Sequence, residues 1–302
     1  MNKALRQTEI IAQQSASIDT WSDSEILTNL LAGQERAIAS VRAALPAIAK
    51  AAEAIAARLK TGGKLVYAGA GSSIRIGVQD GTELPATFGI DEHQLGYLIA
   101  GGQAAMFETL ADKEDSIEDG RSSAAICTNR DVLVAIAASG RTPFTAAALE
   151  EAKKRGAFTI AVINAQNSAL GALADVEILL LSGAEVIAGS TRMGAGTAQK
   201  AALNLMSTLV GIKLHAVHDG MMVGMRPDNE KLKERAARII SEITGAKPQE
   251  AGDALNKTGA IKPAVLVCAG ASPAEAEKLL STSDGNLRQA LAQLHTKPKL
   301  QH

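Results

Sequence analysis

Two short segments rich in glycine and hydroxyl side chains each follow a run of apolar residues. The first is Gly69-Ala-Gly-Ser-Ser73, and the second is Ala138-Ser-Gly-Arg-Thr142. Turns of this kind between a strand and a helix let backbone N–H groups and hydroxyls approach an oxygen anion, and the helix dipole favours negative charge there. One such turn is ordinary in any α/β protein, but two with several hydroxyls indicate a phosphate site.

The ligand of these turns is expected to be a monophosphate. Neither turn ends in the Gly-Lys-Ser/Thr of a P-loop, and the first lacks the third glycine of a dinucleotide-binding fingerprint. Hydroxyl donors come from Ser72, Ser73, Ser139 and Thr142, while Arg141 offers a fork of N–H donors to a phosphate or carboxylate. Nucleotides and nicotinamide cofactors are therefore disfavoured.

Short apolar runs alternate with helical stretches along the middle of the chain. The runs lie at residues 64–69, 95–99, 132–137, 159–163 and 176–181. Alternation of this kind predicts an α/β fold, a three-layer sandwich with a mostly parallel sheet. In such sheets ligands bind outside the carboxyl ends of the strands, which is where both glycine turns begin.

Helical patterns surround this region. Residues 23–59 are Ala-rich and periodic, and Gly33 and Pro46 predict a division into two or three helices. Residues 197–218 predict one long apolar helix. Asn229 and Gly245 mark the start and end of a charged helix, after which three short helices are expected. We expect an N-terminal helical segment at 1–60, an α/β domain at 61–228 and a small helical domain at 240–302.

The composition excludes several classes of function. Lys and Arg number 31 against 32 Asp and Glu, and aromatic residues make up 2%, so nucleic-acid binding is not expected. No stretch reaches the roughly 18 apolar residues of a membrane span, and the N-terminus lacks the apolar core of a signal peptide. The two distant cysteines favour a reducing compartment, so the protein is expected to be cytoplasmic. His215 and His218 lack a further nearby ligand, and no metal is expected.

The run Gly69-Ala-Gly-Ser-Ser-Ile-Arg-Ile-Gly-Val-Gln-Asp80, followed by Glu83-Leu-Pro-Ala-Thr-Phe-Gly89, resembles a segment of the N-acetylmuramic acid 6-phosphate etherase family. That family has Gly-Ala-Gly-Thr-Ser-Gly-Arg-Leu-Gly and then Glu-Cys-Pro-Pro-Thr-Phe at the same spacing. Further segments that fit are Ile99-Ala-Gly-Gly102, Glu114-Asp-Ser116, Ala138-Ser-Gly-Arg-Thr-Pro143 and Gly183-Ala-Glu-Val-Ile-Ala-Gly-Ser-Thr-Arg-Met193. The resemblance covers most of residues 60–230.

The resemblance implies the sugar isomerase (SIS) fold and a lyase without metal or cofactor. The implied reaction removes the D-lactyl ether from N-acetylmuramic acid 6-phosphate by elimination and hydration, in amino-sugar catabolism and peptidoglycan recycling. It implies Glu83 as the acid at the departing lactate and Glu114 as the base at C2, with either order of the two roles left open. The resemblance also implies a further wall of the ligand site, formed by Glu185, Ser190, Thr191 and Arg192. Arg192 is expected to bind the lactyl carboxylate.

The family also implies a homodimer with the active site near the subunit interface, and the C-terminal helices resemble a ubiquitin-associated-like module. The chain departs from the family pattern at Ile74, Leu84, Ala86 and Ala165. These changes leave both glutamates intact and bear on the substrate more than on the fold. Two alternatives stay open: a non-catalytic sugar-phosphate-binding regulator of the SIS fold, and a sugar-phosphate isomerase.

Overall fold

The computed structural model describes residues 15–296, which form two compact units. The first unit contains the chain up to Thr82 together with His93–Val210, and the second contains Glu83–Glu92 and the chain from Gly211 onward. The predicted boundaries at residues 60 and 228 do not coincide with these units. Helices α2 (Gly71–Phe88) and α6 (Gly194–Lys213) each begin in the first unit and end in the second. Residues 1–14, on which the expectation about a signal peptide rests, and 297–302 lie outside the described part.

A five-stranded parallel sheet forms the centre of the first unit. Its strands follow the order β2-β1-β3-β4-β5, so β1 lies between the second and third strands of the chain. All five predicted strands are confirmed to within two residues at their ends. They are β1 (Leu65–Gly69), β2 (Leu95–Ile99), β3 (Val132–Ala137), β4 (Phe158–Ile163) and β5 (Val176–Leu179).

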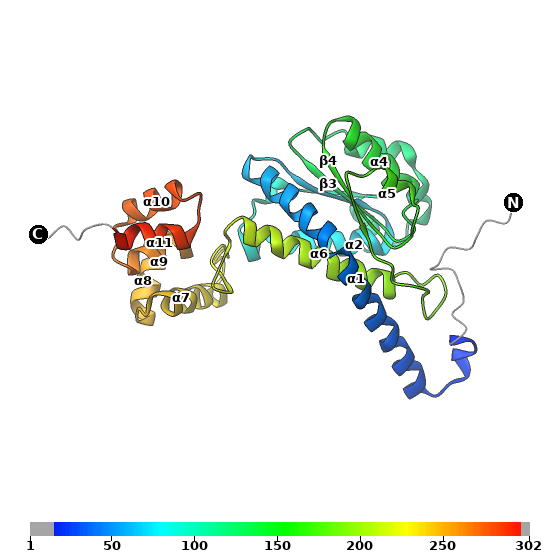
Figure 1. The fold of residues 1–302 in the computed structure, drawn as a ribbon, viewed down its shortest axis with the longest axis horizontal. Coiled ribbons are helices and arrows are strands. Elements are labelled where there is room, and N and C mark those ends of the chain that lie inside the picture. Colours follow the sequence, from blue (N-terminus) through cyan, green and yellow to red (C-terminus); the bar gives the residue numbers. More distant parts are fainter. Residues whose placement is uncertain (1–14, 297–302) are drawn as a thin grey trace, which may run out of the picture. The chain divides into compact units, whose positions relative to one another are not determined.

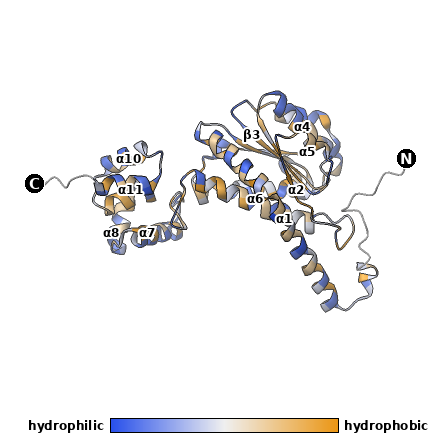
Figure 2. Ribbon diagram, viewed as in Figure 1, coloured by the Kyte–Doolittle hydropathy of each residue, from blue (hydrophilic) through white to orange (hydrophobic). Residues whose placement is uncertain are grey.

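Helices cover both faces of this sheet, which confirms the three-layer α/β arrangement (Figure 1). One face carries α3 (Ile117–Ala124), α4 (Pro143–Lys154) and α5 (Ala169–Leu173), while α1 (Asp23–Lys60), α2 and α6 pack on the other. The central strands are mostly hydrophobic, whereas α1 alternates hydrophilic and hydrophobic residues (Figure 2). Every residue of β1 and β3 is buried. This difference follows from burial, because a parallel sheet covered on both sides has no face exposed to water.

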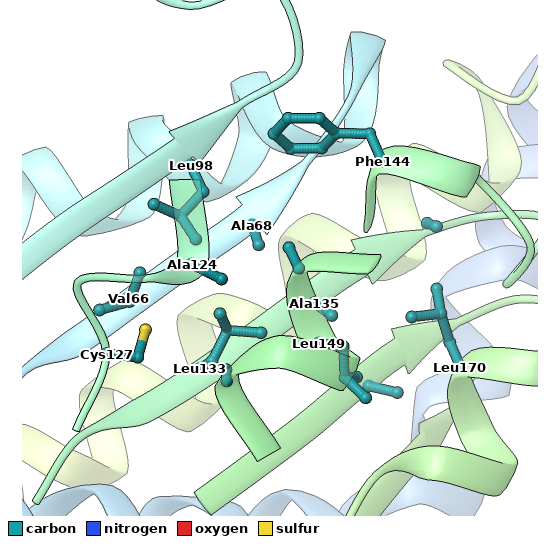
Figure 3. Packing of buried hydrophobic residues seen from close by; sticks show 14 of the residues in the cluster. Val66, Ala68, Leu98, Ala124, Cys127, Leu133, Ala135, Phe144, Leu149 and Leu170 are labelled. Atoms are coloured by element: carbon teal, nitrogen blue, oxygen red, sulfur yellow. The ribbon is translucent and has the colours of Figure 1, made fainter. Parts of the chain in front are cut away.

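The side chains of β1 and β3 alternate between the two faces. Val66 and Ala68 point with Leu133 and Ala135 toward α3 and α4, where Phe144 and Leu149 complete the packing (Figure 3). Short alanine side chains in both strands leave room for the aromatic ring and allow the helices to approach closely. This packing fixes the ends of β1 and β3 beside each other, with Gly69 paired to Ile136.

The predicted division of residues 23–59 into several helices is wrong, because α1 runs without a break from Asp23 to Lys60. Ser22 starts it with a capping box to Glu25, and Gly33 and Pro46 lie within it. Proline removes one backbone hydrogen bond. A buried stripe of nine residues between Ala37 and Leu59 offsets this loss by packing on the sheet.

The predicted apolar helix at 197–218 ends earlier, at Lys213. His215 adopts a left-handed conformation with φ 59°, which stops the helix. Val217–His218 (β6) and Met221–Met222 (β7) then form a short antiparallel hairpin. Within residues 15–296, no helix combines the length and apolar character that a membrane span requires.

Five helices follow in the second unit. Asn229 caps α7 (Glu230–Thr244) by accepting from the Leu232 N–H, and Gly245 ends it with φ 74°, as predicted. Four further helices come after it, one more than predicted: α8 (Pro248–Thr258), α9 (Ile261–Cys268), α10 (Pro273–Thr282) and α11 (Leu287–Thr296). Ser272 caps α10 by accepting a hydrogen bond from the Glu275 N–H. The helices share a core that includes Ile240, Leu255 and Leu266.

Candidate functional site

A pocket of about 380 Å³ opens at the carboxyl ends of β2, β1 and β3. Both glycine turns predicted from the sequence line it, because they follow neighbouring strands of the parallel sheet. Of the predicted binding residues, five contribute to its wall: Ser72, Ser73, Ser139, Thr142 and Thr191. The pocket thus brings together hydroxyl groups from three separate segments of the chain.

The two turns differ in how they continue. After β1, the chain enters α2 at Gly71, so the free N–H groups of the first helical turn lie beside Ser72 and Ser73. After β3, the Ser139 hydroxyl accepts a hydrogen bond from the Arg141 N–H at 3.3 Å, and α4 starts at Pro143. A helix start with adjacent hydroxyls suits an oxygen anion carrying two negative charges.

Glu114 is the one predicted catalytic residue that lines the pocket. It lies half-buried in the short helix η6 (Ala111–Asp115), on the segment that follows β2. Desolvation by burial raises the pKa of its carboxyl, and the negative charge of Asp115 raises it further. A carboxylate whose pKa moves toward neutrality is a better general base than an ordinary surface glutamate.

The Glu114 carboxylate lies over the start of α2. A Cβ placed on Gly71 would meet Glu114 Oε1 at 3.0 Å, and Gly71 has φ 53°. The absence of a side chain at this position therefore allows the carboxylate to approach the first helical turn.

If Glu114 acts as a base in this pocket, we expect Gly71→Ala to lower kcat by about 10- to 100-fold, because the added methyl group displaces the Glu114 carboxylate. Gly62→Ala is the matched control. Gly62 has φ 79°, and a Cβ there would have no neighbour within 4 Å. Both variants carry similar backbone strain of about 1–2 kcal/mol. Steady-state kinetics and thermal denaturation check the prediction, and equal losses of activity in the two variants would contradict it.

Several predicted residues are not among those that line this pocket. Glu83 lies on α2, is exposed and belongs to the second unit. Arg141 and Arg192 are exposed, Ser190 is half-buried, and none of the three lines the pocket. The predictions for these residues stay predictions.

Glu185 has different surroundings from those expected of a substrate ligand. It is only 3% exposed, and its carboxylate oxygens accept hydrogen bonds from the N–H groups of Gly194 at 2.8 Å and Ala195 at 2.9 Å. These bonds satisfy the first donors of α6 and place negative charge at its N-terminus. In this structure Glu185 acts as the cap of α6.

Three pocket residues with polar or charged side chains were not singled out as site residues from the sequence. Arg75, Glu108 and Thr109 all line the cavity. A signal existed for Arg75, since it stands at the arginine of the family segment that follows Gly69. Glu108 and Thr109 lie in an irregular segment between η5 (Gln103–Met106) and η6, where no periodicity marks them.

The departures from the family pattern lie outside the pocket wall. Ile74 is 1% exposed and Leu84 is 2% exposed, and both pack in the interior. The side chain of Ile74 does not line the pocket, and it lies against Gly69, where an added Cβ would meet Ile74 Cβ at 3.2 Å. Ala86 is exposed and Ala165 is half-buried, and neither lines the pocket.

His215 and His218 lie in the second unit. His218 Nε2 is 3.5 Å from Asp219 Oδ2, and the Asp219 carboxylate also accepts a hydrogen bond from Arg288. Burial lowers the pKa of His218. Among residues 15–296, no three His, Cys, Asp or Glu side chains gather closely enough to hold a metal ion.

Comparison with known families gives two matches. Residues 104–210 match the SIS domain, and residues 47–153 match the N-terminal SIS domain of glucokinase regulatory protein. Among solved structures, a phosphoheptose isomerase from Francisella tularensis is 20% identical, with a TM-score of 0.49, and covers 64% of this chain and 100% of its own.

Two curated relatives extend over nearly the whole chain. An N-acetylmuramic acid 6-phosphate etherase from Symbiobacterium thermophilum is 45% identical over 86% of this chain and 87% of its own. Another protein of that name, from Streptomyces avermitilis, is 43% identical over 94% of this chain and 93% of its own.

Proposed function

The chain belongs to the N-acetylmuramic acid 6-phosphate etherase family, and we propose that it cleaves the D-lactyl ether of N-acetylmuramic acid 6-phosphate to N-acetylglucosamine 6-phosphate and D-lactate. The observation that carries this proposal is the placement of Glu114 beside two hydroxyl-rich turns in one pocket. Such a site holds a phosphate and presents a carboxylate to the rest of the same ligand. We assign the reaction to the carbon–oxygen lyases and place it in cytoplasmic recycling of peptidoglycan sugars.

The phosphate group binds at the start of α2 in this proposal. Ser72 and Ser73 donate from the first turn, and Ser139 and Thr142 donate from the turn after β3. The charged side chains that line the pocket are Arg75, Glu108 and Glu114, which give no net positive charge, so backbone N–H groups and the helix dipole supply most of the attraction. No metal or organic cofactor takes part in the proposed reaction.

Glu114 removes the C2 proton of the open-chain sugar. The neighbouring aldehyde acidifies this proton, and the electron pair left on C2 forms the C2–C3 double bond as the C3–oxygen bond breaks. An acid donates a proton to the departing lactate oxygen. Water then adds its oxygen to C3, and C2 recovers a proton. The raised pKa of Glu114 suits a group that takes up this proton and returns one.

Glu83 is the proposed acid. Glu83 is exposed, and because the family resemblance implies an active site near the subunit interface, the proposal assigns it to the pocket of a partner subunit. A twofold-symmetric homodimer makes this exchange reciprocal, since each subunit then supplies one glutamate to each site. Arg192, which is also exposed, is proposed for the lactyl carboxylate.

We expect Asp115→Asn to move the acidic limb of the pH profile of kcat/KM to lower pH. The Asp115 charge raises the pKa of Glu114, and removing that charge lets Glu114 stay ionised in more acidic solution. The pKa that this limb reports should stay above that of an ordinary glutamate, because desolvation is the larger cause of the raised pKa of Glu114. Asp112→Asn is the control, since Asp112 is paired with Lys113. An unchanged or higher limb in Asp115→Asn would count against Glu114 as the base.

The proposal is tested by incubating the purified full-length protein with N-acetylmuramic acid 6-phosphate and measuring D-lactate with a coupled dehydrogenase. Release of D-lactate in step with N-acetylglucosamine 6-phosphate supports the etherase. Tight binding of the sugar phosphate without lactate release supports the alternative of a non-catalytic regulator, which the match to glucokinase regulatory protein favours.

A further inference from the structure

Arg75 connects α2 to the wall of the pocket that carries Glu114. Its Nε and Nη2 atoms donate to the carbonyl oxygen of Ala105 at 3.2 and 2.9 Å, and Nη2 also donates to the carbonyl oxygen of Glu108 at 2.8 Å. Of the described residues that line the pocket, Arg75 alone is positively charged. Its guanidinium thus binds protein carbonyls at the edge of a site that receives an anion.

The segment held by Arg75 consists of residues 101–115. The backbone hydrogen bonds that its N–H groups donate outside η5 and η6 are local. Gly102 donates to Ile99, Ala105 to Gly102, Phe107 and Glu108 to Ala104, and Lys113 to Leu110. Short turns of this kind fix the segment internally, and η6 at its end packs on α4. The three bonds from Arg75 join the segment to a helix that starts some 30 residues earlier in the chain.

Both parts of the site depend on the same helix. Gly71 and Ser72 open α2 at the phosphate turn, and Arg75 follows one helical turn later. Glu114 Oε1 lies beside Gly71, while Glu108 and Thr109 occupy the same wall as Glu114. The helix α2 therefore carries the proposed anion-binding turn and, through Arg75, sets the distance between that turn and residues 101–115.

We propose that Arg75 is a positioning residue, whose guanidinium holds residues 101–115 against α2 and so keeps Glu114 at the reacting carbon. This inference rests on the proposed function for its catalytic consequence. The chemistry requires arginine, since a planar fork donates several N–H groups to two carbonyl oxygens at once, whereas a lysine ammonium does not reproduce that geometry.

The test compares Arg75→Met and Arg75→Lys with Arg121→Met, which removes an exposed arginine paired with Glu150. We expect Arg75→Met to lower kcat by about 10- to 100-fold, with KM changed by less than about threefold because the phosphate turn is intact. Arg75→Lys is expected to recover part of the loss. Arg121→Met is expected to match the wild type.

Hydrogen–deuterium exchange gives a readout that does not depend on activity. In Arg75→Met, the amides of residues 101–115 are expected to exchange faster, while those of β1 and β3 keep their wild-type rates. Unchanged exchange in residues 101–115 would overturn the proposal, as would wild-type kcat in Arg75→Met. Faster exchange throughout both strands would also overturn it, because it would show general destabilisation. If the wild-type protein had no etherase activity but Arg75→Met still showed faster exchange only in residues 101–115, the proposed function would be refuted. The inference that Arg75 holds this segment against α2 would remain supported.

Discussion

Replacing Glu114 with glutamine is expected to lower D-lactate release by about 10²–10⁴-fold, because the amide keeps the size of the side chain but cannot accept the C2 proton. Glu114 lines the pocket, and the hydroxyl turns do not depend on its charge. The sugar phosphate should therefore still bind. The measurements are kcat from the coupled lactate assay and the dissociation constant from calorimetry.

Glu118→Gln is the matched control for this prediction. Glu118 lies on α3, four residues from Glu114, and it is exposed. The Glu118→Gln variant should keep the wild-type turnover. Its melting temperature should equal that of the Glu114→Gln variant. If Glu114→Gln retained full activity, the assignment of the base would be refuted. Equal losses in both variants would show that net charge in this region matters instead of one carboxylate.

Replacing Glu83 with glutamine is expected to abolish lactate release to a similar extent, because the departing oxygen then lacks its proton donor. Glu92→Gln is the control, as Glu92 is an exposed glutamate near Arg226 in the same unit. Glu83 is exposed, so its replacement should leave the melting temperature unchanged.

Mixed dimers show whether the two glutamates come from different subunits. A dimer that pairs a Glu83→Gln chain with a Glu114→Gln chain has one site with both glutamates and one with neither. Purified through two different affinity tags, it should have roughly half of the wild-type activity, since one of its two sites is intact. Activity no higher than that of either parent variant would mean that a site takes both glutamates from one chain, contrary to the proposal. A chain that remains monomeric in solution would also contradict it.

The strands and the two glycine turns were predictable from the sequence because their signals are local. An apolar run such as residues 132–137 is long enough for a buried strand, and a Gly-Ser turn directly follows it. The parallel order of the sheet then places both turns at one edge, as observed for Gly69 and Ile136. Helix caps at Asn229 and Ser272 were predictable for the same reason.

Other features depend on contacts between distant residues. Gly33 and Pro46 predicted breaks in α1 that do not occur. Tertiary packing overrides the break at Pro46, because the buried stripe of the helix runs from Ala37 to Leu59 and continues past this proline. The role of Glu185 as a cap of α6 requires the loop before that helix to fold back on its start. Arg75 reaches the Ala105 carbonyl only once β2 lies beside β1. The sequence around Arg75 therefore does not predict its hydrogen-bond partner.

The departures from the family pattern gain a physical explanation from burial. Ile74 and Leu84 add apolar volume to the interior of the fold, and neither reaches the pocket. The pocket wall keeps both hydroxyl turns and Glu114. We therefore expect the substrate of the family, and not an altered one, to be the substrate of this chain.

In the proposed reaction, the pocket lined by Glu114 breaks the bond between C3 and the ether oxygen by elimination, and water then adds to C3. The most direct test is to run the reaction of the wild-type protein in water labelled with heavy oxygen and to determine the mass of both products. We expect the label on C3 of N-acetylglucosamine 6-phosphate and none in D-lactate, which keeps the ether oxygen. Heavy oxygen in D-lactate, or no lactate at all, would contradict the account.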